Sequence, residues 1–116
     1  MIDALLARGP VLTDGAWGTQ LFARGLPRGE RPDLWNLTHP DEVEAVARGY
    51  VEAGSRVILT NTFQANRFVL GDDADVTAIN RAGAAISRRA AGEGVRVLGS
   101  IGPGTKLPTL GHITYR

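Results

Sequence analysis

Small polar residues and glycines gather at three places where an apolar run of the sequence ends. These places are Asp14-Gly15-Ala16-Trp17-Gly18-Thr19, Thr60-Asn61-Thr62-Phe63 and Gly99-Ser100-Ile101-Gly102-Pro103. In the first, a carboxylate is followed by two small residues, which puts an acceptor beside exposed backbone N–H donors. Such a pair is suited to hold the ammonium and carboxylate groups of an amino acid.

Each of these segments also has a purely structural interpretation. Asp14 could make a local Asx hydrogen bond in the turn that follows a strand. Asn61 and Thr62 supply donors and acceptors that could line a pocket walled by Phe63. They could equally form an Asx turn beside a core phenylalanine, and the residue types alone leave both interpretations open.

Alternating strands and helices are expected to position these segments. Short apolar runs predict strands at Val11–Thr13, Arg56–Thr60 and Val95–Ile101. Apolar residues spaced three or four apart predict helices at Asp41–Ala53 and Asp75–Ala91. This order favours parallel strands joined by right-handed crossovers. Each polar segment follows one of these parallel strands, so the three segments should share one edge of the sheet. Ligands collect at this carboxyl edge.

The connections between these elements are expected to be irregular. Residues Thr19–Arg24 predict a turn of helix, whereas Arg24–Pro40, rich in proline and glycine, reads as an extended loop. A further loop should begin at Asn61, and the tail after Gly102 should also be loop. The aspartates before the second helix fit helix capping better than metal binding.

Bulk properties exclude several classes of partner. The net charge is +1 and the arginines are scattered, so we expect no nucleic-acid binding. No segment reaches the roughly 18 apolar residues of a membrane span. The N-terminus has no signal-peptide pattern, which favours a cytoplasmic protein with no membrane association.

Cysteine is absent from the 116 residues, so this chain cannot supply a disulfide, a thiolate nucleophile or a thiolate metal ligand. His39 and His112 lie far apart, and no other metal-ligand pattern stands near either one. We therefore expect both histidines at the surface or at helix caps. No residue of the chain is predicted to be catalytic or to bind a metal.

An ordered set of motifs resembles the homocysteine S-methyltransferase family across essentially the whole chain. Within that family, the sequence is most similar to the homocysteine-binding module of cobalamin-dependent methionine synthases. The motifs are Asp14-Gly15-Ala16-Trp17-Gly18-Thr19-Gln20-Leu21, Leu34-Trp35-Asn36-Leu37 with Pro40-Asp41-Glu42-Val43, Tyr50-Val51-Glu52-Ala53-Gly54-Ser55, Ile58-Leu59-Thr60-Asn61-Thr62-Phe63-Gln64-Ala65-Asn66 and Gly99-Ser100-Ile101-Gly102-Pro103.

The resemblance implies an α/β fold, the first three strands and two helices of an incomplete (β/α)8 TIM barrel. A complete barrel takes about 250 residues, so residues 1–116 would form the N-terminal part of one homocysteine-binding domain, with no second domain. The family implies that Asp14 binds the homocysteine amino group and the Gly15-Ala16 backbone its carboxylate. Asn61 and Thr62 would line the same pocket, and Trp17 would shape its mouth.

The resemblance also implies zinc held by three cysteine thiolates, with the homocysteine sulfur completing the coordination. Those cysteines are expected on later strands, beyond this sequence. A zinc-bound thiol is deprotonated, whereas a free thiol, with a pKa of about 8.5, is mostly protonated at neutral pH. Methylcobalamin on another module, betaine and S-methylmethionine serve as methyl donors among relatives, and the sequence does not identify the donor.

Three hypotheses follow. The leading one is an N-terminal fragment of a zinc-dependent enzyme that methylates homocysteine to methionine, inactive as an isolated chain. The second is a small, non-enzymatic α/β module that binds an amino acid. The third is one half of a barrel whose remaining part lies on another chain. An isolated three-stranded sheet would leave apolar side chains and open strand edges uncovered.

Overall fold

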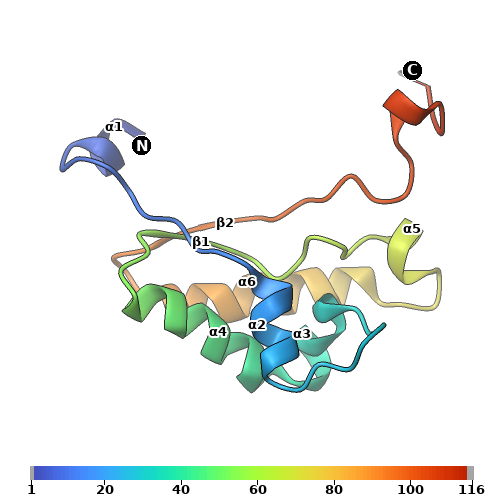
Figure 1. The fold of residues 1–116 in the computed structure, drawn as a ribbon, viewed down its shortest axis with the longest axis horizontal. Helices are drawn as coiled ribbons and strands as arrows, with labels where there is room; N and C mark the ends of the chain where they lie inside the picture. The colour runs from blue at the N-terminus through green and yellow to red at the C-terminus, as the bar shows by residue number, and fades with distance from the viewer. Residues whose placement is uncertain (1, 115–116) are drawn as a thin grey trace.

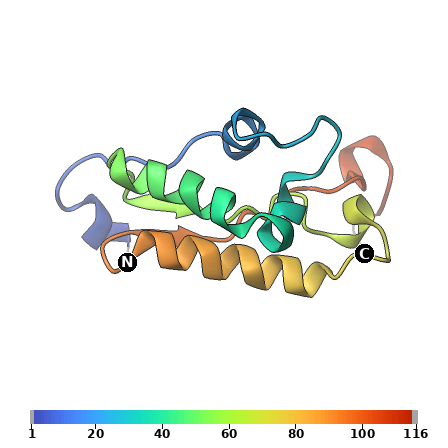
Figure 2. The same cartoon turned by 90° about the horizontal axis from the view of Figure 1, so that it is seen from below.

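The structure, a computed structural model, describes residues 2–114 and consists of a small parallel sheet with helices packed on one face. Strand β1 (Val57–Leu59) pairs with strand β2 (Arg96–Leu98), and Val57 lies opposite Arg96 in the register. Helices α4 (Pro40–Glu52) and α6 (Val76–Ala91) run side by side beneath the two strands (Figures 1 and 2). The predicted α/β class and the parallel pairing are confirmed.

The predicted strand Val11–Thr13 is wrong as a strand of three residues. This segment touches β1 through a single parallel bridge between Thr13 and Val57. Leu12 O accepts from Arg56 N at 2.9 Å and from Val57 N at 3.4 Å, and Asp14 N donates to Val57 O at 3.0 Å. The run is short and lies between Pro10, which has no N–H to donate, and the turn at Gly15, so no ladder forms.

Both long helices confirm their predicted positions within one or two residues. Helix α4 begins at Pro40, which has no N–H to leave unpaired, and ends before Gly54, whose φ of 105° favours glycine. Helix α6 is capped by Asp75, whose side chain accepts from Ala78 N at 2.9 Å. This bond confirms the capping role expected for the aspartates before the helix.

Several short helices were not predicted. The segment expected as an extended loop from Arg24 to Pro40 contains the 3-10 helix η1 (Pro32–Leu34) and helix α3 (Trp35–Thr38). They are too short to show a periodic pattern, and buried contacts of Asp33, Trp35 and Asn36 hold them in place. The remaining short elements that were not predicted are α1 (Ile2–Leu6), α5 (Arg67–Leu70) and η2 (Pro108–Leu110). The turn of helix predicted at Thr19–Arg24 is confirmed as helix α2 (Trp17–Ala23).

The apolar core lies between the helices and the sheet. One buried cluster joins α2, α3, α4 and α6 through Leu21, Leu26, Trp35, Val43, Val46 and Ile86. A second joins the ends of α4 and α6 to the strands through Ala47, Ile58, Ala90, Ala91 and Val95. Among residues 2–114, the other face of the sheet is less covered, as the exposed fractions of 64% for Leu12 and 47% for Leu98 show.

Candidate functional site

Hydrogen bonds draw the three polar segments together at the carboxyl edge of the sheet. Leu59 N donates to Asp14 Oδ2 at 2.7 Å, which ties the first segment to the end of β1. Thr62 Oγ1 donates to Ser100 O at 2.8 Å, and Gly102 N donates to Phe63 O at 3.0 Å. The sequence-based expectation that these segments share one edge is therefore confirmed.

Asp14 has one carboxylate oxygen in use and one free. Its Oδ2 accepts from both Trp17 Nε1 and Leu59 N, each at 2.7 Å. Its Oδ1 has no hydrogen-bond partner among residues 2–114. Asp14 therefore clamps its own loop to β1, and it still offers an acceptor to a bound cation.

The Gly15-Ala16 backbone is exposed beside this carboxylate. Neither N–H group makes a hydrogen bond within the described part of the chain. The Ala16 carbonyl, in contrast, accepts from Tyr50 Oη at 2.7 Å. Burial, followed by the negative charge of Asp14, raises the pKa of Tyr50 above its ordinary value of 10.0, which favours the protonated, donating hydroxyl.

Asn61 and Thr62 are buried, and the structure uses most of their polar atoms internally. Asn61 Nδ2 donates to Pro32 O and to Asn36 Oδ1, both at 2.9 Å. The hydroxyl of Thr62 bonds to the Thr60 hydroxyl at 2.6 Å and to the Ser100 carbonyl. Both side chains thus support the polar edge from beneath.

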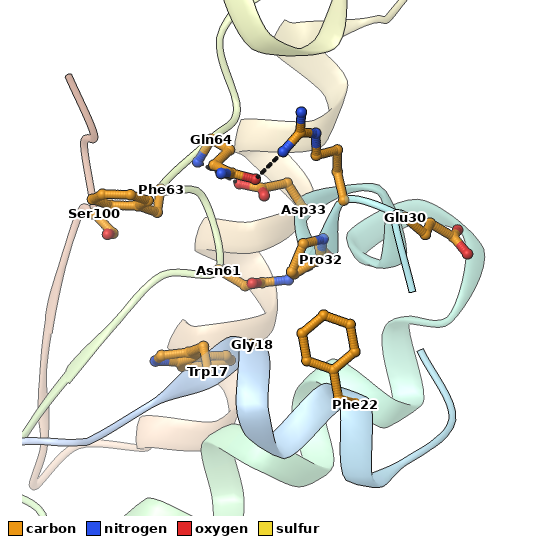
Figure 3. A pocket seen from close by; sticks show the side chains of 12 residues that line it. Trp17, Gly18, Phe22, Glu30, Pro32, Asp33, Asn61, Phe63, Gln64 and Ser100 are labelled. Atoms are coloured by element: carbon orange, nitrogen blue, oxygen red, sulfur yellow. Dashed lines mark hydrogen bonds between the residues drawn. The ribbon is translucent and has the colours of Figure 1, made fainter. Parts of the chain in front are cut away.

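A cavity of about 530 Å³ opens next to the Asp14 loop. Asn61 lines it, and so does Trp17, which connects it to Asp14 through the indole hydrogen bond. In the view of Figure 3, Trp17 and Phe22 lie at one end, and Gln64 and Asp33 lie at the other. Thr62 lines a second cavity of about 390 Å³, while Asp14, Gly15 and Ala16 are not among the lining residues of either one.

Asp33 is a buried carboxylate that the sequence did not single out. Its side chain is almost inaccessible, and Oδ1 accepts from Gln64 N at 3.0 Å. Burial raises its pKa above the ordinary value of 3.8, although backbone hydrogen bonds and the charge of Arg31 act in the opposite direction. Nothing in its immediate sequence distinguishes it from an exposed loop aspartate.

Asn36 and Tyr50 are two further residues that bond to the polar segments and that residue types alone did not indicate. Asn36 Nδ2 donates to Asn61 O at 2.8 Å and to Ile79 O at 3.1 Å, which binds α3 to α6 and to the end of β1. Both residues stand in segments that carried the family resemblance. That resemblance was the one signal that could have drawn attention to them.

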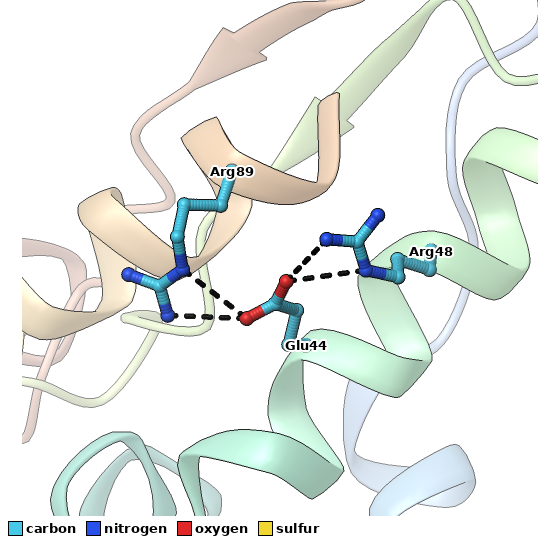
Figure 4. A network of polar contacts seen from close by, with 3 residues as sticks. All are labelled: Glu44, Arg48 and Arg89. Carbon is cyan, nitrogen blue, oxygen red and sulfur yellow. Dashed lines mark hydrogen bonds and ion pairs between the residues drawn. The ribbon is translucent and has the colours of Figure 1, made fainter. Parts of the chain in front are cut away.

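Away from this edge, Glu44 joins α4 to α6 by two ion pairs (Figure 4). One oxygen lies 2.6 Å from Arg48 Nη2, and the other lies 3.1 Å from Arg89 Nη2. The Arg48 hydrogen bond, with a further contribution from Arg89, lowers the pKa of Glu44. The network is exposed and holds two helices together, so we assign it no part in the site.

The described residues do not provide the metal site that the family resemblance implies. Among residues 2–114 there is no group of three or more His, Cys, Asp or Glu side chains placed to hold an ion. His39 is exposed and stacks on Trp35, and exposed His112 accepts a hydrogen bond from Leu107 N. The thiolates of the implied site are absent as well, because the chain has no cysteine.

None of the helices described here combines the length and the apolar character needed to cross a lipid bilayer.

Comparison with known proteins identifies relatives of the whole chain. A family model described as homocysteine S-methyltransferase matches residues 11–116. The methionine synthase of Mycobacterium tuberculosis (strain ATCC 25618 / H37Rv) is 44% identical over 130 residues, covering 99% of this chain and 11% of that protein. The methionine synthase of Mycobacterium leprae (strain TN) is 44% identical over 126 residues, covering 96% of this chain and 10% of that protein.

A solved structure shows the same arrangement. The crystal structure of the homocysteine methyltransferase MmuM from Escherichia coli, in its metallated form, superposes with a TM-score of 0.72 and 29% sequence identity. The match covers 88% of this chain and 41% of that chain. The chain therefore spans about a tenth of the length of the methionine synthases it matches and less than half of MmuM.

Proposed function

Because the chain belongs to the homocysteine S-methyltransferase family, we propose that it forms the part of such an enzyme that holds the amino-acid end of homocysteine. The observation that carries this proposal is the free Oδ1 of Asp14 beside the unpaired N–H groups of Gly15 and Ala16. An α-amino acid presents an ammonium and a carboxylate about one carbon apart. The Asp14 oxygen can accept from the ammonium, and the two backbone N–H groups can donate to the carboxylate.

In the bound complex, Asp14 Oδ1 accepts from the substrate ammonium, and the Gly15-Ala16 backbone donates to the carboxylate. The thiol-bearing side chain then extends past Trp17 toward the cavity that Asn61 lines. Thr62 contributes by fixing the neighbouring Ser100 segment through its hydroxyl. These residues bind and orient the substrate, and none of them reacts.

The reaction proposed for the complete enzyme is methyl transfer from a donor to homocysteine, which gives methionine. A bond forms between the sulfur and the methyl carbon, the bond from that carbon to the donor breaks, and its electron pair leaves with the donor. The thiol must lose its proton first, because the thiolate is the nucleophile and a free thiol has a pKa of about 8.5. A zinc ion bound in the complete enzyme would lower the pKa of the thiol, so that its proton would pass to solvent.

The residues of this chain are not suited to hold that zinc ion. The chain has no cysteine, and residues 2–114 contain no metal-binding cluster. We therefore assign no step of the reaction to a metal here. We propose that the isolated chain binds homocysteine without methylating it. The remaining barrel segments, on this polypeptide or on another, would supply the chemistry.

Exposed apolar residues favour assembly into a barrel over an independent binding module. Leu12, Leu98 and Ile101 are 64%, 47% and 91% exposed, and all three lie on or next to the strand segments. Large apolar side chains exposed along strand segments are typical of an interface. Analytical ultracentrifugation of the purified chain tests this, because a stable monomer at high concentration would favour the independent module.

The proposed binding mode can be tested by titration calorimetry with homocysteine and two truncated analogues. One analogue, 4-mercaptobutyrate, lacks the amino group, and the other, 3-aminopropanethiol, lacks the carboxylate. We expect Asp14→Asn to weaken homocysteine binding about tenfold or more, because it removes a charge-assisted hydrogen bond. The variant should bind 4-mercaptobutyrate as the wild type does.

The analogue without the carboxylate serves as the matched control. It should still lose affinity in the Asp14→Asn variant, because it keeps the ammonium that Asp14 accepts from. If the variant instead lost affinity equally for all three ligands, Asp14 would not be the ammonium acceptor. If the wild-type chain bound none of them, the proposed function itself would be wrong.

A further inference from the structure

Tyr50 connects helix α4 to the loop that carries Asp14. Its hydroxyl donates to Ala16 O at 2.7 Å across 34 residues of sequence. The ring lies against the same loop, with its centroid 6.4 Å from that of Trp17. This bond ties the Ala16 backbone, at the N-cap of helix α2, to helix α4.

Gly15 and Tyr50 fit each other closely. A Cβ atom added at Gly15 would come within 3.2 Å of Tyr50 Oη and 3.4 Å of Cε1. The hydroxyl therefore occupies the space that a side chain at position 15 would need. This packing leaves the loop backbone pressed against the ring, with its other side open to a ligand.

The end of helix α4 holds the loop on both sides of Asp14. Ser55 Oγ donates to Thr13 O at 3.1 Å, and Ser55 N donates to Tyr50 O at 3.0 Å. Thr13 precedes Asp14, and Ala16, which Tyr50 holds, follows it. Because a peptide unit is planar and trans, the Tyr50 hydrogen bond sets the orientation of the Ala16–Trp17 peptide plane. The close approach of the Tyr50 ring to Gly15 restricts the backbone that precedes this plane.

We propose that Tyr50 is a positioning residue that holds the Gly15-Ala16 backbone in the orientation required by the substrate carboxylate. This inference rests on the proposed function, since it assigns Tyr50 to the same amino-acid site. Tyr50 touches the loop and not the substrate. Its effect on binding passes through the order of the loop backbone.

The test compares Tyr50→Phe, which keeps the ring and removes the hydroxyl, with Ser87→Ala. Ser87 is a matched control because its hydroxyl also donates to a backbone carbonyl, that of Leu59, at 3.0 Å from helix α6. Nitrogen-15 relaxation of the full chain measures the order of Gly15 and Ala16 without any ligand. Homocysteine titration of the same samples measures affinity.

In the wild type we expect backbone order parameters of about 0.85 at Gly15 and Ala16. In Tyr50→Phe we expect the order parameters of the same two residues to fall below about 0.6. Homocysteine affinity should fall about five- to tenfold in Tyr50→Phe and should not change in Ser87→Ala. A purely structural role would lower the thermal stability of both variants and leave the loop order equal. Unchanged order and affinity in Tyr50→Phe would overturn the positioning role.

A second variant keeps the inference testable if Tyr50→Phe folds poorly. Gly15→Ala should weaken binding by pressing its Cβ on the Tyr50 hydroxyl, and the same change should cost less affinity in the Tyr50→Phe background. Additive losses would count against the proposed contact. A wild-type chain that binds no homocysteine would overturn the proposed function, whereas normal binding with an unaffected Tyr50→Phe variant would remove only the role of Tyr50.

Discussion

Two polar loops stand at the same edge of the sheet, yet the structure uses them in opposite ways. In the loop of residues 14–17, one Asp14 oxygen and the backbone N–H groups of Gly15 and Ala16 remain unpaired among the described residues. In the loop of residues 60–64, the amide nitrogen of Asn61 and the hydroxyl of Thr62 are bonded within the protein. The first loop keeps polar groups free for the ligand that we propose, whereas the second loop uses its polar groups to support the fold.

This difference shows that polar composition at a strand end does not by itself indicate a binding residue. Burial decides the outcome, because a buried polar group left without a partner costs about 1–3 kcal/mol. Asn61 and Thr62 are buried, and the Asn61 amide nitrogen and the Thr62 hydroxyl accordingly have partners within the protein. Substitutions in the buried loop or its partners should reduce stability, and those in the exposed loop should reduce binding.

The largest stability effect is expected at Asn36, which bonds to Asn61 through both its amide nitrogen and its oxygen. Asn36→Ala leaves the carbonyls of Asn61 and Ile79 without this donor in the core. We expect the free energy of unfolding to fall by about 2–4 kcal/mol, measured by urea denaturation. Asp14→Asn, which keeps an acceptor oxygen, should change it by less than about 1 kcal/mol. Equal losses would remove the distinction between the two loops.

A smaller effect is expected at Gly83 in helix α6, where the buried loop packs against the helix backbone. A Cβ atom there would lie 2.7 Å from both Asn36 Nδ2 and Thr62 Cγ2. We expect Gly83→Ala to reduce stability by about 1–2 kcal/mol, since the crowding outweighs the higher helix propensity of alanine. Thermal unfolding followed by circular dichroism measures the change.

Gly49 in helix α4 is the matched control for this substitution. A Cβ atom at Gly49 would meet nothing within 4 Å. Gly49→Ala should therefore increase stability by about 0.5–1 kcal/mol through helix propensity alone. A stabilising Gly83→Ala would show that the buried loop tolerates displacement, and it would contradict the expected loss of stability.

The smallest effect concerns the pH dependence that Asp33 confers on the buried loop. Burial raises the pKa of this carboxyl in the folded state above its ordinary 3.8. The stability contribution of a group with a raised pKa is complete below its unfolded pKa and is lost as the pH rises through the folded pKa. Wild-type stability should thus fall, relative to Asp33→Asn, as the pH rises from about 4 toward neutrality.

Urea unfolding of the two proteins across that range measures this difference, and contributions from other titrating groups cancel between them. Asparagine retains an oxygen that can accept from Gln64 N, so the hydrogen bond of the native loop has a substitute. A constant difference between the two curves would show that burial does not perturb Asp33. A difference of the opposite sign would mean that Arg31 outweighs burial.

Much of the architecture could be predicted from local pattern. The apolar spacing in α4 and α6 and the apolar run at β1 are long or continuous enough to identify the elements. The short helices η1 and α3 were missed because packing, not propensity, stabilises them. Val11–Thr13 was overpredicted because an apolar run does not reveal whether a neighbouring strand pairs along its whole length.

The sequence by itself determined the α/β alternation, the family, and the three polar segments at the carboxyl edge. Only the tertiary structure decided which polar atoms of those segments remain free. The bond from Leu59 N to Asp14 spans 45 residues, and that from Tyr50 to Ala16 spans 34. Such bonds depend on which buried groups the fold brings within about 3 Å of one another, and no local pattern of residue types encodes that proximity.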